Sequence, residues 1–437
     1  MKLIKTVLTV FLLIHDVSFA VTESCKKIVF DVHGLNRTEE TWFRDYLQLG
    51  QYESWSPEES SKLRQKIMTT DIFTSAEVSE ALDPSNCSVE IDVTEKWTRI
   101  PVVRGAYGGG TPLLILGGYE TNAFGHLLAI GGEIRRYGNM APGAFFFLKS
   151  PRAWRGRGLW GGELWVDRRR RDFFDNDGIV YGYVNSESWT GKFQLLYPVS
   201  DLSSSGWQAG VQAQIIHEKP ATFSAQPNYS GVALGLPEDL RTNESAGNGG
   251  VIAPMIAYDD LSVEGLNYSG LKSKLSLGVS RSVASGGRFA EGEIYAFSHL
   301  PSDVNLAGRV FMASTSENTV GSVYYLGGFD SIRGLPDGIH YGNTIAYGNF
   351  EARVIAAKWK YVHLQPALFV DVGSTWMRDG NFGTGRETSL GGGIRIAIPQ
   401  IYRFVIRIDY GVSVGNTKSR GFSVGLNQFF QPYKLVF

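Results

Sequence analysis

The sequence predicts an all-β transmembrane barrel of about 16 antiparallel strands, preceded by one small α+β domain. Three observations lead to this fold class. Helical periodicity is confined to residues 25–97, whereas from Arg99 onward short segments alternate apolar and polar side chains, the period-two pattern of strands. That region continues for roughly 337 residues, too many for an ordinary soluble sandwich. Glycine, which supplies turns and close backbone approaches, accounts for 52 of the 437 residues.

Composition excludes several classes of protein. Aromatic residues make up 13% and charged residues only 19%, so the chain is too apolar to be disordered. After the first twenty residues no apolar stretch approaches the ~18–20 residues that a spanning helix needs, which excludes a helical transporter. The 42 basic and 43 acidic side chains nearly balance. Without a basic excess, nucleic acid is not an expected partner.

The first residues have the features of a targeting segment. In residues 1–20, lysines precede an apolar run that ends in Ser18-Phe19-Ala20, the spacing of a secretory signal peptide with its cleavage site. The mature chain would then enter an oxidising compartment. Cys25 and Cys87, the only cysteines, could pair there and close a loop worth ~4 kcal/mol. Two unpaired buried thiols are the alternative.

Residues 21–98 form the predicted small domain, with the order β-α-α-β-β. Thr38-Glu39-Glu40-Thr41 has the pattern of a capping box and opens the first helix. Pro57, directly after Ser56, opens the second. The two later strands are expected at residues 73–78 and 87–93. One small core fits this length.

Residues 99–437 form the predicted barrel. Spanning strands need ~9–11 residues, with apolar side chains outside and polar side chains in the lumen. Fourteen to sixteen such strands fit the length. Because these barrels have an even number of strands, 16 is favoured. Four segments near the C-terminus are distinctive: Gly327-Gly328-Phe329-Asp330-Ser331-Ile332-Arg333-Gly334-Leu335, Gly348-Asn349-Phe350-Glu351-Ala352-Arg353, Leu368-Phe369-Val370-Asp371-Val372-Gly373-Ser374-Thr375-Trp376 and Gly421-Phe422-Ser423-Val424-Gly425-Leu426-Asn427-Gln428-Phe429-Phe430.

These segments resemble the bacterial surface antigen superfamily, whose members pair POTRA domains with a 16-stranded outer-membrane barrel. BamA-like assembly factors and two-partner-secretion transporters belong to it. The chain resembles a short member with a single POTRA domain. The specific part of the resemblance covers residues 320–430, and the match of residues 25–97 is one of topology.

The resemblance implies that a long loop folds back into the lumen and carries Arg333 and Gly334 at its tip. Glu351 and Asp371, on lumen-facing positions of the following strands, would then be the acidic partners of Arg333, because an unpaired buried charge costs several kcal/mol. Three separate charges in a wet channel are the alternative.

The resemblance also implies a first–last strand seam that can open, joining residues 101–109 to residues 421–430. Gly425 would allow the closing strand to kink. Alternatively, Gly425 simply makes room for a bulky lumen side chain. The closing strand could also extend to Phe437.

Other signals point away from an enzyme, and neither a cofactor nor a metal site is expected. Two G-x-S-x-G matches, at residues 411–415 and 421–425, lie within alternating strands rather than at a strand-to-helix turn. The scattered histidines lack metal-ligand spacing. The arginine run at residues 168–171 could bind lipopolysaccharide phosphates or line a constriction, but a solvated loop is the favoured interpretation.

The function expected from these features is insertion or translocation of polypeptides at the bacterial outer membrane. The small domain would lie in the periplasm and receive client strands at an edge near residues 75–82. Expected partners are an unfolded outer-membrane or secreted polypeptide, the lipid bilayer, lipopolysaccharide, and accessory periplasmic proteins or a second copy. A partner-specific secretion channel is the alternative, and a passive porin-like barrel a third.

Overall fold

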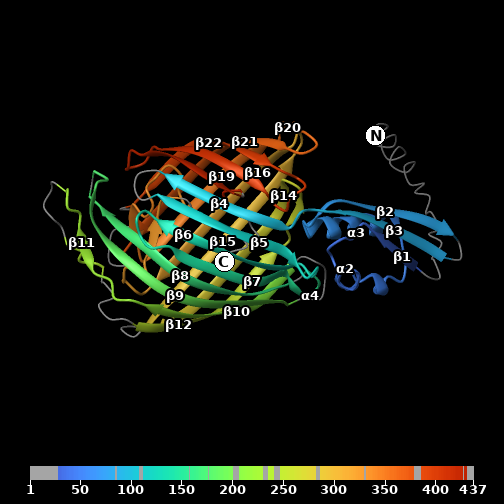
Figure 1. Cartoon of the computed structure of the whole chain (residues 1–437), viewed down its shortest axis with the longest axis horizontal. Helices are drawn as coiled ribbons and strands as arrows, with labels where there is room; N and C mark the ends of the chain where they lie inside the picture. Colours follow the sequence, from blue (N-terminus) through green and yellow to red (C-terminus); the bar gives the residue numbers. More distant parts are fainter. Residues whose placement is uncertain are drawn as a thin grey trace, which may run out of the picture.

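The computed structural model describes residues 28–83, 86–107, 112–156, 158–175, 177–199, 206–229, 235–240, 247–281, 286–328, 331–377, 385–426 and 428–430. Figure 1 shows a tall β-barrel with the small N-terminal domain, drawn in blue, at one end. We call this end of the barrel proximal and the opposite end distal. None of the helices in these residues has the length and apolarity needed to cross a bilayer.

The N-terminal domain packs two helices against a three-stranded sheet of order β1-β3-β2. β1 runs parallel to β3, and β2 runs antiparallel to it, so β1 and β2 are the edge strands. The predicted β-α-α-β-β order is therefore confirmed. The elements are β1 (Ile28–His33), α2 (Glu40–Leu47), the 3-10 turn η1 (Leu49–Gln51), α3 (Pro57–Thr69), β2 (Phe73–Asp83) and β3 (Asn86–Glu95).

The two helix starts show one correct and one wrong sequence prediction. α3 begins at Pro57 as predicted, and Ser56 caps it, because its hydroxyl accepts from the backbone N–H of Glu59. The predicted capping box at Thr38 is wrong, since Glu39 caps α2 by accepting from the N–H of Trp42. The Thr38 hydroxyl instead accepts a hydrogen bond from Asn122 of the barrel. Thr38 thus serves the domain junction rather than the helix.

The barrel closes through sixteen long strands in sequence order, and the fold class predicted from the sequence is confirmed. Three short strands, β11 (Phe223–Ala225), β13 (Ser262–Glu264) and β20 (Ala357–Lys358), extend individual turns. The long strands are β4 (Arg99–Tyr107), β5 (Leu113–Ala123), β6 (Leu128–Tyr137), β7 (Gly143–Arg152), β8 (Gly158–Phe174), β9 (Val180–Pro198), β10 (Gly206–Glu218), β12 (Gly247–Asp259), β14 (Asn267–Arg281), β15 (Gly286–Leu300), β16 (Val304–Thr315), β19 (Thr344–Val354), β21 (His363–Trp376), β22 (Glu387–Ala397), β23 (Val405–Ser413) and β24 (Arg420–Leu426). A short turn labelled α4 (Ala153–Gly156), with Trp154 and Arg155 in the left-handed conformation, joins β7 to β8.

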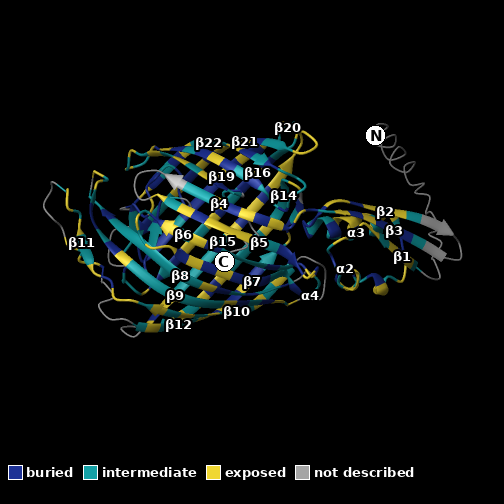
Figure 2. Ribbon diagram, viewed as in Figure 1, coloured by how far each residue is buried: buried dark blue, intermediate teal, exposed yellow. Residues whose placement is uncertain are grey.

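Side chains alternate between the two faces of the barrel wall, and Figure 2 shows the resulting pattern of exposed and buried residues. Outward positions are mostly apolar, as in Leu368, Val370 and Val372 of β21. The intervening positions Phe369 and Asp371 are buried, and Asp371 is fully so. An apolar outer face and a polar inner face are what a bilayer and an aqueous lumen require.

The arginine run lies in β8 and not in a solvated loop, so that prediction is wrong. The four arginines alternate between the two faces of the strand, and three of them form ion pairs with carboxylates. Arg168 contacts Glu187 at 3.1 Å, Arg169 contacts Asp167 at 2.6 Å, and Arg170 contacts Asp172 at 2.6 Å. Arg171 lies over the ring of Tyr325, 4.2 Å from its centroid. Because β8 is long, the whole arginine run lies within the sheet.

The N-terminal domain is fixed to the proximal rim by a buried ion group. Asp71, between α3 and β2, accepts from Lys96 at 2.6 Å and from Arg403 at 2.6 Å. Arg403 belongs to the turn between β22 and β23. Burial by itself would raise the pKa of Asp71, but the two cations outweigh it and hold that pKa below the usual value. Apolar residues of both parts share one core, including Leu127 and Tyr402 from the barrel.

Candidate functional site: the lumen charge network and the closing seam

A loop between β16 and β19 folds into the lumen. Its stem is the hairpin β17 (Tyr324–Leu326) with β18 (His340–Gly342). Leu326, Ile332 and Leu335 are buried against inward-facing side chains of β16 and β19, in one cluster with Ala313 and Tyr347. Apolar packing therefore holds the loop against this side of the wall.

The tip of the loop touches the wall through two glycines. Gly334 has a φ of +85°, a conformation that glycine adopts without strain. A Cβ on Gly334 would lie 2.6 Å from the backbone of Gly411 in β23, so no larger residue fits. The hydroxyl of Ser419 donates to the Gly334 carbonyl at 2.8 Å. These contacts place Arg333 directly against the inner surface of β19 and β21.

Arg333 contacts both acidic residues that the sequence placed near it. Its Nε and Nη2 donate to the two oxygens of Asp371, each at 2.8 Å, and its backbone N–H donates to Asp371 at 3.0 Å. Its Nη1 donates to Glu351. Arg333 is only 2% exposed. A bidentate pair between a guanidinium and a carboxylate is the strongest geometry for such a contact.

The charge network contains more residues than the three that the sequence predicts. Arg395 of β22 donates to Asp409 of β23 at 2.5 Å and to Glu351 at 3.1 Å. Arg353 of β19 donates to Glu351 at 2.6 Å, and Arg407 of β23 lies 3.3 Å from Asp409. Together with Arg333 of the loop and Asp371 of β21, these form a group of four arginines and three carboxylates, of which all but Arg333 lie on inward positions of adjacent strands. The period-two alternation of residues 405–409 could have placed Arg407 and Asp409 on this face.

The C-terminal segment also enters the lumen. β24 ends at Leu426, and Gln428 donates to Gln365 of β21 at 2.9 Å. The ring of Phe429 lies 3.9 Å from the Arg333 guanidinium carbon, opposite Phe369 at 3.5 Å, so the cation is held between two rings. Phe430 is 1% exposed. The expected closing strand through residue 430 is therefore too long, and residues 431–437 lie outside the described residues.

Among the described residues, the seam between the last and the first strand is short. β24 pairs with β4 at Phe422–Tyr107, Ser423–Ala106 and Val424–Gly105. By contrast, β8 and β9 pair over sixteen residues, Leu159 to Phe174. The seam lies where the sequence placed it, although residues 108, 109 and 427 are outside the described residues.

Gly425 faces the lumen beside two arginines. A Cβ on Gly425 would lie 3.3 Å from Nη2 of Arg407 and 3.8 Å from the side chain of Arg104. Gly425 is not among the residues with positive φ. This geometry agrees with the alternative interpretation, in which Gly425 makes room for bulky lumen side chains and does not kink the strand.

Cys25 and the side chain of Cys87 lie outside what the structure describes, and so does the pairing proposed for them. Within the described residues, no group of three or more His, Cys, Asp or Glu side chains could hold a metal ion.

A cleft of about 780 Å³ joins the N-terminal domain to the proximal mouth of the barrel. One side is the edge strand β2, at residues 73–77, and the other side includes barrel turns near Gly265 and Lys360. Gln428, at the start of the inserted C-terminal segment, also lines it. The cleft thus runs from an edge strand of the N-terminal domain to the segment that follows β24.

These features define a sixteen-stranded membrane barrel with an inward loop and one docked N-terminal domain. Residues 305–430 match the model of the Omp85 superfamily domain. The resemblance predicted from the sequence is thereby confirmed for these residues, and the single POTRA domain stays a prediction. Barrels of this superfamily are outer-membrane proteins. No curated protein matches the chain.

Solved structures show the same fold at low sequence identity. BamA from Haemophilus ducreyi lacking POTRA domains 1–3 is 14% identical, with a TM-score of 0.52 over 92% of this chain and 84% of that one. CdiB from Acinetobacter baumannii is 13% identical, with a TM-score of 0.58 over 92% and 74%. CdiB from Escherichia coli is 10% identical, with a TM-score of 0.51 over 94% and 92%.

Proposed function

We propose that the protein inserts polypeptide strands into the outer membrane by opening the seam between β4 and β24. The observation that carries this proposal is the seam itself, which has three residue pairs among the described residues, whereas every other pair of neighbouring long strands has at least seven. Membrane barrels close because an unpaired strand edge in lipid is costly. A short closing pair costs the least to separate, and its exposed edges can then pair with an incoming strand.

The N-terminal domain would lie in the periplasm and deliver the client. β2 is an edge strand, and an extended peptide can add to such an edge through backbone hydrogen bonds. The cleft beside residues 73–77 leads from this edge to the barrel mouth. A client strand bound there would be close to the seam. Folding of the client in the bilayer would supply the driving force.

The test is insertion of a urea-unfolded model barrel into liposomes that hold the purified full-length protein. In a background with Cys25→Ser and Cys87→Ser, cysteines at the paired positions Ala106 and Ser423 would lock the seam as a disulfide. We expect the locked protein to lose its acceleration of insertion and to regain it on reduction. The control disulfide joins the paired positions Val166 and Trp189 of β8 and β9 and should have no effect. Equal insertion rates for both disulfides would contradict the proposal.

A second candidate function is passage of a secreted partner through the lumen. The observation that favours it is that the inward loop, Phe429 and Phe430 occupy the lumen together. Deleting residues 326–338 should then convert small, flickering single-channel currents into a large, stable conductance. A locked seam should leave export intact, which separates this function from insertion. The same steady conductance before and after the deletion would favour a passive, porin-like barrel.

A further inference from the structure

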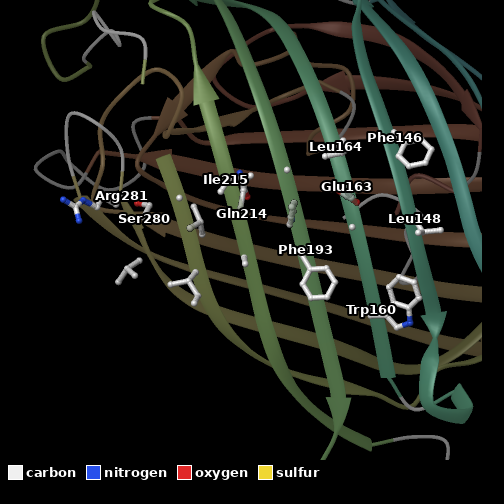
Figure 3. A pocket seen from close by; sticks show the side chains of 18 residues that line it. Phe146, Leu148, Trp160, Glu163, Leu164, Phe193, Gln214, Ile215, Ser280 and Arg281 are labelled. Atoms are coloured by element: carbon white, nitrogen blue, oxygen red, sulfur yellow. The ribbon is translucent and has the colours of Figure 1, made fainter. Parts of the chain in front are cut away.

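The outer wall of the barrel carries an apolar groove of about 900 Å³ that crosses six neighbouring strands, β7 to β10, β12 and β14 (Figure 3). Two rows of outward residues form it. The first row is Gly162, Phe193, Ala213, Ile252 and Val279, which pair in this order across the strands. Small residues alternate with exposed large ones, so the outer surface is recessed at the small residues.

The second row, Leu164, Gly191, Ile215, Gly250 and Arg281, runs beside the first and ends in a cation. Six strands spaced by ~4.8 Å give the groove a length of about 24 Å. With strands tilted by ~35–45°, it descends roughly 15 Å along the barrel axis, half of a ~30 Å hydrocarbon core. The groove therefore spans about one leaflet.

The charged end of the groove lies at the distal rim. β14 begins next to the N-terminal domain, where Gln65 of α3 contacts Ser262 of the adjoining turn, and it runs away from that domain to Arg281. Figure 3 shows Arg281 beyond the apolar side chains, at the strand end. With the N-terminal domain in the periplasm, this rim faces the outer leaflet.

A second hollow of about 640 Å³, lined by both apolar and polar residues, adjoins the groove and shares Val279 and Ser280 with it. Arg288 and the hydroxyl residues at positions 314–316 line this hollow. Arg288 pairs with Val279, so Arg281 is its diagonal neighbour on the same face, about 7–8 Å away. Both arginines are exposed. The nearby acid is Glu317, which accepts from the Ser280 hydroxyl.

We propose that the groove and the hollow together bind one phosphorylated glycolipid of the outer leaflet. Its acyl chains would lie along the two apolar rows, its phosphate between Arg281 and Arg288, and its sugar hydroxyls in the hollow lined by serine and threonine. Guanidinium groups bind phosphate through paired, charge-assisted hydrogen bonds. A diacyl phospholipid would fill the groove but would leave the hydroxyl-lined hollow without a sugar. The site does not depend on whether the seam inserts polypeptides, but it rests on the periplasmic placement of the N-terminal domain proposed above.

The test uses native mass spectrometry on the full-length protein in detergent, with three probes: bisphosphorylated lipid A, the same lipid after phosphate removal, and phosphatidylglycerol. We expect lipid A to bind at least tenfold more tightly than either of the others. Arg281→Gln with Arg288→Gln should weaken lipid A binding at least tenfold. Arg136→Gln, an exposed arginine on β6 outside the groove, should not change it.

A groove-filling variant tests the apolar part separately. Added Cβ atoms at Gly162 and Gly250 meet no atom closer than 3.8 and 3.7 Å, so leucines there should leave the barrel folded. Gly162→Leu with Gly250→Leu should weaken lipid A binding at least tenfold. The control is Gly308→Leu on β16, where the nearest atom is at 3.6 Å. Equal binding of lipid A and phosphatidylglycerol, or no loss in either double variant, would show only non-specific boundary lipid and overturn the proposal.

Discussion

Two neighbouring parts of the barrel wall are built in opposite ways. From β19 to β23 the strands are joined by long ladders and linked on the lumen side by the network around Arg333, Glu351 and Asp409. One strand further on, β24 meets β4 over three residue pairs. The rigid part and the weak part are thus adjacent, and they share β23, which carries Arg407 and Asp409.

If the seam opens as proposed, this difference would let the barrel open without unfolding. If all strand pairs were equally strong, separating any one of them would be resisted equally and no position would be favoured. A network that fixes one wall concentrates opening at the neighbouring pair, since local stability in proteins is unevenly distributed. The inward loop belongs to the fixed wall, because its tip contacts Gly411 of β23. It can act as the support against which the seam moves.

The strongest way to break the fixed wall is Arg333→Glu. The new carboxylate would face Glu351, Asp371 and Asp409 in a buried site, and removing one partner of a buried ion group costs about 3–5 kcal/mol. We expect most of the protein to lose the compact, heat-modifiable form of a folded barrel on cold gel electrophoresis.

Arg420→Glu is the matched control for this charge reversal. Arg420 is an exposed arginine at the start of β24, and its replacement should leave the folded fraction unchanged. If Arg333→Glu folded as well as Arg420→Glu, the network would not be what fixes this wall.

The next prediction concerns the seam itself. Amides of residues 105–107 and 422–424 should exchange with deuterium at least ten times faster than amides in the centre of the β8–β9 pair, because local opening of a short ladder costs less. Hydrogen–deuterium exchange of the protein in nanodiscs measures both regions in one sample. Equal protection would remove the contrast between the two walls.

The sequence was sufficient for the architecture because alternation is local. Period-two patterning and strand length predicted the barrel, and the β-α-α-β-β order followed from caps and apolar stripes. Element ends were less predictable. Thr38 looks like a helix cap, but its hydroxyl is used by Asn122, a barrel residue 84 positions away. No local pattern contains that contact.

The candidate site was predictable only in part. Arg333, Glu351 and Asp371 came from motif resemblance, and the structure brings them together. Arg395 and Arg407 carry no motif, and their role depends on the register between strands, which the sequence does not specify. The inward course of Phe429 was also hidden, because residues 421–430 alternate as a strand would. Its side chain leaves the sheet to cover the Arg333 guanidinium.

Acid should loosen the connection between the fixed wall and the N-terminal domain. Arg403, two residues before β23, pairs with Asp71, whose pKa is held below its ordinary value of 3.8. The pairing therefore stabilises the junction above that value and is lost as the pH falls through the lowered pKa. We expect the thermal midpoint of the domain to drop between neutral pH and about pH 3 more in the wild type than in Asp71→Asn. Asp45→Asn, in the exposed pair with Arg155, should behave like the wild type.

The smallest expected effect comes from Gly425→Ala, where the fixed wall and the seam touch. The added Cβ would meet the end of the Arg407 side chain at 3.3 Å, and a flexible guanidinium can move by a few tenths of an ångström. We expect a change in stability below about 1 kcal/mol and unchanged exchange at residues 422–424, because alanine adopts strand geometry without strain. Gly425→Leu should displace Arg407 and destabilise the barrel more. If alanine alone suppressed exchange at the seam and slowed insertion, Gly425 would act through backbone freedom, and the kink would belong to the opening mechanism after all.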